Sequence, residues 1–191
     1  MERRGEGLGG LSTALLLASP MDPGGEAVCV DHLTAGEEPP ERVLSVVFTG
    51  RPDQRVERWE RHAGTLPETF VVLSTQRSVR PAEGAEVVTL DRPGDLTDIG
   101  VAITERIAEW PDDGRGAFCL DSLTAQLQYV DEKQLYQFLH TLRDHLADRG
   151  VVGHVHMNPA AHDRETVETF ETLFDAVIEV DEDGHTVTAR R

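Results

Sequence analysis

Short apolar runs alternate with longer amphipathic segments along most of the chain, and this alternation constrains the fold more than any other feature. The runs are almost continuously apolar, which is typical of strands covered on both faces. The expected strands are 14–19, 43–49, 70–75, 86–90, 117–120, 151–157 and 176–180, with 185–189 as the second strand of a terminal hairpin.

The segments between these strands predict helices, at 26–33, 52–63, 95–110, 131–149 and 163–174. Pro52 lies just inside the start of one of them and Gly64 follows its end, which is the usual asymmetry of helix termini. Strands that alternate with helices imply right-handed βαβ units and a mostly parallel sheet with helices on both faces. We therefore expect a single α/β domain over residues 1–191, with the first ten residues flexible.

Carboxylates outnumber cations by about two to one. The 191 residues include 35 Asp and Glu but 18 Lys and Arg, a formal net charge of −17, and Lys133 is the only lysine. This balance is typical of halophilic proteins, because molar salt screens the repulsion between carboxylates. A merely acidic mesophilic protein is the alternative. Either way nucleic acid is not expected as a partner, since a phosphate backbone requires a cationic surface.

Cys29 and Cys119 are far apart in the sequence and form no CxxC pair. Two isolated cysteines in a chain of this size predict reduced, buried thiols and a cytoplasmic protein. No apolar run is as long as a membrane-spanning helix requires, so no membrane association is expected.

The turn after the first expected strand lies where a phosphate-binding loop would be found. A working loop reads Gly-x-x-x-x-Gly-Lys-Ser/Thr: backbone amides and the lysine hold the phosphates, and the hydroxyl holds magnesium. On this pattern Ser19 replaces the first glycine and Gly24 keeps the second, while Gly25 replaces the lysine and Glu26 the hydroxyl residue. The alternative is an ordinary βα turn containing proline and glycine.

The segment Ala-Phe-Cys-Leu-Asp-Ser-Leu-Thr, residues 117–124, is an apolar strand ending in Asp121-Ser122. This ending resembles the Walker B motif of the RecA/KaiC-like ATPase superfamily, where the aspartate helps to hold hydrated magnesium. The resemblance extends over residues 118–180, and the chain looks like a divergent haloarchaeal member with a degenerate Walker A motif. It implies a RecA-like sheet of the P-loop NTPase type.

The sequence departs from active members of that superfamily at two of three catalytic elements. Active members carry a catalytic glutamate beyond a central strand, whereas the nearest equivalent here, Ser74-Thr75-Gln76, has no carboxylate. The Walker A lysine is also missing, so that only Asp121 remains. Its alternative role is to cap the turn into the next helix. The resemblance therefore implies a pseudo-ATPase with no catalytic residues and no cofactor, in which ATP and magnesium are disfavoured.

Histidines gather at the end of the expected strand 151–157. His154 and His156 are two residues apart and share one face of the strand. With His162 and Asp163 they offer ligands that zinc accepts, although hydrogen bonds to backbone or carboxylate are the alternative. Ligands of α/β sheets bind at the carboxyl ends of the strands. The candidate ligand-edge residues there are Thr75, Gln76, His154, His156 and Asn158.

Three hypotheses about function remain open. The first is an inactive RecA/KaiC-like domain with a regulatory or protein-interaction role, whose partner is another protein or a second copy of the chain. The second is a nucleotide-binding protein that uses backbone amides around Gly24 and Gly25 without the lysine. The third is a metal-dependent hydrolase built on a set of four residues: His154, His156, Asp163 and Asp121.

Overall fold

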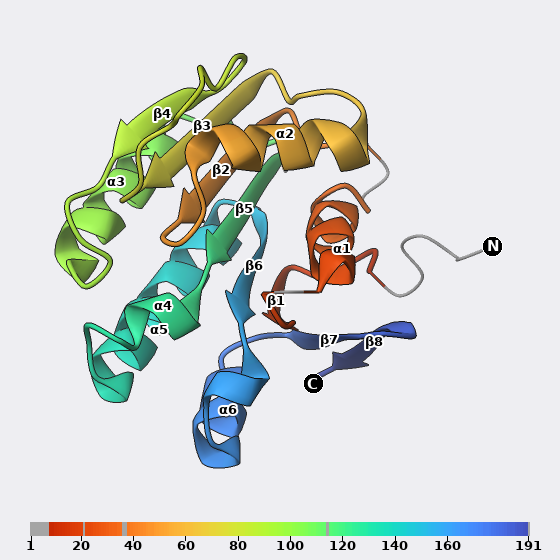
Figure 1. The fold of residues 1–191 in the computed structure, drawn as a ribbon, viewed down its shortest axis with the longest axis vertical. Coiled ribbons are helices and arrows are strands. Elements are labelled where there is room, and N and C mark those ends of the chain that lie inside the picture. Colours follow the sequence, from red (N-terminus) through yellow and green to blue (C-terminus); the bar gives the residue numbers. More distant parts are fainter. Residues whose placement is uncertain (1–7, 21, 36–37, 114, 191) are drawn as a thin grey trace.

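The computed structural model describes residues 8–20, 22–35, 38–113 and 115–190. Eight strands of these residues form one sheet in the order β4-β3-β2-β5-β6-β1-β7-β8 (Figure 1). Neighbouring strands are parallel except β7 and β8, which form an antiparallel hairpin. The bounds are β1 Thr13–Leu17, β2 Arg42–Val47, β3 Thr69–Ser74, β4 Glu86–Thr89, β5 Gly116–Asp121, β6 Val152–Met157, β7 Ala176–Asp181 and β8 Gly184–Ala189. The predicted α/β class, mostly parallel sheet and terminal hairpin are confirmed.

The helices are α1 Pro23–Leu33, α2 Pro52–Ala63, α3 Leu96–Ala108, α4 Leu123–Gln126, α5 Glu132–Asp148 and α6 Arg164–Glu171, with a 3-10 turn at Pro159–Ala161. Helix α2 has the predicted bounds, and Gly64 ends it at φ +82°, a left-handed conformation that glycine adopts without strain. The predicted 26–33 helix is three residues longer at its start, because Asp22 caps it and Pro23 fits the first turn. Helix α4 was not predicted.

Two apolar layers lie on opposite faces of the sheet. Alternate strand residues point to opposite faces, so Leu16 belongs to the layer that contains buried residues of α1 and α2, while Leu15 belongs to the layer that contains buried residues of α3, α5 and α6. Each layer is continuous from helix to strand, and together they fix the carboxyl ends of the strands at one edge. Of the first ten residues, which were predicted to be flexible, 1–7 lie outside the described residues, whereas Leu8 is buried in the first layer.

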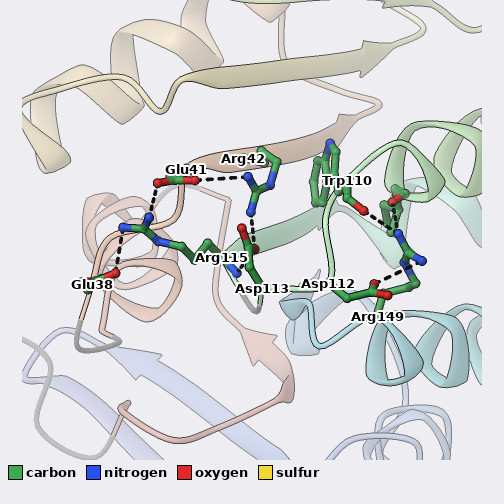
Figure 2. A network of polar contacts seen from close by, with 9 residues as sticks. Glu38, Glu41, Arg42, Trp110, Asp112, Asp113, Arg115 and Arg149 are labelled. Atoms are coloured by element: carbon green, nitrogen blue, oxygen red, sulfur yellow. Dashed lines mark hydrogen bonds and ion pairs between the residues drawn. The ribbon is translucent and has the colours of Figure 1, made fainter.

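A network of ion pairs lies near the amino ends of β2 and β5 (Figure 2). Arg42 contacts Glu41 and Asp113, and Arg115 contacts Glu38 and Glu41. Three carboxylates therefore share two guanidinium groups, which joins the loop before β2 to the loop before β5. Such partly exposed pairs stabilise a fold only modestly, because water and salt screen them.

About half of the carboxylates have no cation to balance them, since 35 Asp and Glu side chains face 18 Lys and Arg side chains. We expect the free energy of unfolding to fall as KCl is lowered from about 2 M to about 0.1 M, because the screening length grows from about 2–3 Å to about 10 Å. Urea unfolding curves at matched KCl concentrations measure this. Equal stability in both buffers would contradict the halophile interpretation.

Candidate functional site

A pocket of about 400 Å³ lies at the carboxyl ends of β1, β2, β5 and β6, the edge predicted for ligand binding. It is bounded by the loop after β1, the first turns of α1, the side of α2 and the turn after β5. Its lining includes the sequence-predicted residues Ser19, Gly25, Glu26, Asp121, Ser122, His156 and Asn158, together with Cys29, Arg55 and Arg58. The structure therefore brings the loop after β1 and the acidic end of β5 to one cavity.

The amides of Gly24 and Gly25, at the start of α1, already donate hydrogen bonds within the chain. Asp22 caps α1, and its Oδ1 accepts a hydrogen bond of 2.8 Å from the Gly24 amide. The Gly25 amide donates to the Asp22 carbonyl oxygen at 3.2 Å. Since a carboxylate already lies at the amino end of α1, the positive end of the helix dipole interacts with an internal anion.

Glu26 follows in the first turn of α1 and faces the side of α2. Its carboxylate pairs with Arg58 at 2.9 Å and with Arg61 at 3.7 Å. The two arginines neutralise the negative charge of Glu26, the residue predicted to replace the hydroxyl residue of a phosphate-binding loop. Arg58 does not supply the positive charge that a lysine would offer to a phosphate, because its guanidinium is already paired with the Glu26 carboxylate.

The Asp121-Ser122 ending of β5 lies on the opposite wall of the pocket, and the peptide bond between the two residues is cis. The alternative prediction, that Asp121 caps the helix after β5, is wrong, because the capping residue is the next one along the chain. Ser122 caps α4 instead, with its Oγ accepting from the Ala125 amide at 3.4 Å. Asp121 is partly exposed, and it lines the pocket.

The other predicted ligand-edge residues divide into two groups. Asn158 lines the pocket, and its Oδ1 accepts from the Ala160 amide at 3.1 Å. Thr75 and Gln76 do not line it, because their side chains donate to the carbonyl oxygen of Phe48. They support the backbone between β2 and β3.

The four residues predicted as possible metal ligands are not brought together. His162 Nε2 lies 3.0 Å from Thr124 Oγ1, and Asp163 caps α6 by accepting from the Thr166 amide at 2.8 Å. His154 and His156 instead lie beside Cys29 and Cys119, and the ligand atoms of these four residues are within 4.8 Å of one another.

This group of two cysteines and two histidines lies between the sheet and α1, with His156 partly exposed and the other three residues buried. Cys29 projects from α1, Cys119 from β5, and the histidines from β6. The sulfurs are 3.8 Å apart, and His154 Nε2 is 3.2 Å from Cys29 Sγ and 3.0 Å from His156 Nε2. Cys29 and His156 also line the pocket, so the group forms part of its floor.

A buried arginine and a third histidine surround the group. Arg55 of α2 is 6% exposed, and both terminal nitrogens of its guanidinium lie 3.3 Å from Cys29 Sγ. Its Nε donates to Ser45 Oγ at 2.8 Å. His32 Nδ1 lies 3.0 Å from His154 Nδ1, which completes a chain of contacts across the interior.

These surroundings shift the acidity of the group. A hydrogen bond from Cys119, joined by the charge of Arg55, holds the pKa of Cys29 well below its usual value against the opposing effect of burial. Burial raises the pKa of the Cys119 thiol. Burial also lowers the pKa of His32 to about 3, so this imidazole is neutral at physiological pH and one ring nitrogen accepts a hydrogen bond.

The two histidines are recognisable as candidate ligands from the sequence, whereas the two cysteines look like isolated buried thiols. The missing signal was the register of β5 and β6, in which Cys119 is the Cα partner of His154. Because β5 and β6 are neighbours in the sheet, these two residues lie side by side on one face, but the strand order was not deducible from the sequence. The segment 51–61 interleaves arginines with Glu57 and Glu60, a pattern that predicts a solvated helix face for Arg55. This prediction is wrong, because α2 packs Arg55 against the sheet.

Comparisons with known proteins add a family and a fold. The model of DUF7504, described as a family of unknown function, matches residues 12–180. No curated protein matches the sequence. A solved structure from a structural study of a Pyrococcus horikoshii OT3 protein is similar with a TM-score of 0.60 and 10% identity, over 93% of this chain and 85% of that one. At this identity the likeness concerns the fold alone.

Proposed function

Because the chain belongs to DUF7504, a family of unknown function, we propose its function from the site itself: a RecA/KaiC-like domain that does not hydrolyse ATP and has a regulatory or protein-interaction role. The site supports this proposal in two ways. The strand-loop-helix of β1 and α1 and the acidic end of β5 meet at one pocket, as phosphate-binding and magnesium-binding motifs must do in an ATPase. The groups that would act on a triphosphate are nevertheless replaced.

The observation that carries the proposal is the carboxylate of Asp22. A phosphate at the amino end of a helix is held by free backbone amides and the helix dipole. Here the Gly24 amide donates to Asp22 Oδ1, so a phosphate would have to displace this carboxylate or lie against it. Repulsion between the two anions opposes binding, and no lysine is present at position 25 to offset it.

The proposed partner is another protein or a second copy of this chain. A nucleic acid is disfavoured by the net charge of −17. Among the described residues, no helix combines the length and apolarity that a bilayer crossing requires.

Calorimetric titration with ATP, with and without magnesium, tests the proposal. In about 2 M KCl, which screens the acidic chain, we expect no saturable binding up to about 1 mM ATP, which corresponds to a binding free energy weaker than about 4 kcal/mol. Saturable, magnesium-dependent binding by the unmodified chain would contradict the proposal and favour a nucleotide-binding protein with a non-standard loop.

A restored loop provides the positive control. The variant Asp22→Gly/Gly25→Lys/Glu26→Thr removes the internal carboxylate and supplies the lysine and hydroxyl. Ala18→Gly is included, since a Cβ at position 25 would lie 3.0 Å from the Ala18 Cβ. We expect this variant to gain ATP binding. If it folds and still binds no nucleotide, the proposed relation to the RecA/KaiC-like superfamily loses its support.

A further inference from the structure

We propose that Cys29, Cys119, His154 and His156 form a binding site for one zinc-type divalent metal ion. This inference goes beyond the proposed function, because neither ATP binding nor its absence requires a metal at this position. The four residues come from three elements, α1, β5 and β6, and all lie in the layer between the sheet and α1.

The separations match the edges of a tetrahedron. Zinc–sulfur bonds of about 2.3 Å and zinc–nitrogen bonds of about 2.0 Å place two sulfurs about 3.8 Å apart, sulfur and nitrogen about 3.5 Å apart, and two nitrogens about 3.3 Å apart. The corresponding distances are 3.8 Å between the sulfurs, 3.2 Å from Cys29 Sγ to His154 Nε2, and 3.0 Å between the two Nε2 atoms. All pairs lie within 4.8 Å, so closure around an ion needs shifts on the order of 1 Å.

Hydrogen bonding alone accounts poorly for this arrangement. His154 Nε2 contacts both Cys29 Sγ and His156 Nε2, yet one imidazole nitrogen has either one proton or one lone pair. It therefore makes one good hydrogen bond and leaves the second contact weak. A metal ion satisfies both nitrogens and both sulfurs at once, because each directs one lone pair to a common centre.

The donor set selects the class of metal. Two thiolates and two imidazoles in tetrahedral geometry suit zinc, whereas magnesium and calcium prefer oxygen ligands. Four protein ligands also leave no open position for water, which is the pattern of a structural site rather than a catalytic one.

The groups around the four ligands suit a bound metal. A metal-ligating histidine usually donates its other ring proton to an acceptor. His154 Nδ1 lies 3.0 Å from His32 Nδ1, so a His154 N–H at this atom can donate a hydrogen bond to the His32 nitrogen. Both Arg55 nitrogens approach Cys29 Sγ at 3.3 Å and donate to the thiolate.

An entry path exists from the pocket. Cys29 and His156 line its floor, and His156 is only half-buried. An ion that reaches the pocket meets these two ligands first, before the buried Cys119 and His154. The bound ion would then fasten α1 to the centre of the sheet directly behind the degenerate loop.

Zinc titration of the metal-stripped full chain tests the site. The chain is purified under reducing conditions in molar KCl, treated with a chelator, and titrated with zinc while bound metal is counted by elemental analysis. We expect one zinc per chain and, at free zinc about 1,000-fold above the Kd, a rise in Tm of about 8 °C or more. Magnesium should not raise Tm. A folded chain that binds no stoichiometric zinc overturns the proposal.

Cobalt(II) reports the ligands in the unmodified protein, independently of any variant. A tetrahedral cobalt with two thiolates gives strong visible bands and sulfur-to-cobalt charge transfer, and we expect both. Cys119→Ser should halve the charge-transfer intensity and weaken cobalt binding at least 100-fold, while His162→Ala, whose side chain lies outside the group, should leave both unchanged. An octahedral spectrum, or unaltered binding in Cys29→Ser/Cys119→Ser, overturns the assignment.

Discussion

Replacing Arg55 by methionine should lower the free energy of unfolding by about 3–5 kcal/mol, because the buried Cys29 sulfur, whose pKa is held well below its usual value, loses both of its guanidinium partners. The Arg55 guanidinium contacts Cys29 Sγ with two nitrogens and Ser45 Oγ with the third, and it contacts no carboxylate of the residues that the structure describes. Methionine has a similar volume, so the loss reflects the polar contacts more than a cavity. Urea unfolding in the presence of a chelator measures the effect without any contribution from metal.

The matched control is Arg58→Met on the same helix. Arg58 pairs with Glu26 at the pocket wall with about a third of both side chains exposed, so its removal should cost less than about 1 kcal/mol. The double variant Arg55→Met/Cys29→Ala should lose less than the sum of the single losses, since it leaves no Cys29 sulfur without its guanidinium partners. Equal losses for Arg55→Met and Arg58→Met would mean that Arg55 is not buried against Cys29.

Phe118→Ala should destabilise the chain by about 3–5 kcal/mol, through lost burial and a cavity at the centre of the sheet. Phe118 is 0% exposed and lies on β5, between Leu44 of β2 and Gly153 of β6. A Cβ at Gly153 would come within 3.2 Å of the Phe118 Cβ, so glycine leaves room for the aromatic side chain. Thermal and urea unfolding together measure the loss.

Phe118→Leu is the control for volume, and it should cost less than half as much because leucine fills most of the space. Losses of similar size for leucine and alanine would indicate that ring shape rather than cavity volume determines stability here. A loss below about 1 kcal/mol for alanine would contradict the central position of β5.

The regular elements were predictable because each is determined by a local pattern. The run at 43–49 is apolar on both faces, and Pro52 and Gly64 mark the ends of α2 in the sequence itself. The start of α1 was placed too late, because Gly24 and Gly25 read as loop residues although the Asp22 cap brings them into the first turn. Helix α4 has four residues, too few to show a periodic pattern.

The site was predictable only where one motif carries it. The loop after β1 and Asp121 were found separately, and the expectation that ligands bind at the carboxyl ends of strands placed them at one edge. The group of Cys29, Cys119 and the two histidines depends on which strands are neighbours and on how α1 packs. Strand order and helix packing depend on contacts between residues that are far apart in the chain, and local patterns in a single sequence do not specify them.

The wide spacing of the four sulfur and nitrogen ligands has a consequence for the order of events during folding. Cys29 is 90 residues from Cys119 and 125 from His154, so an unfolded chain that gathered them would close loops costing about 4–5 kcal/mol each in entropy. Only the neighbouring histidines are available together before the sheet forms. An ion at this position therefore binds the folded chain in preference to folding intermediates. A chain that retains the ion is one in which β5, β6 and α1 are already packed together.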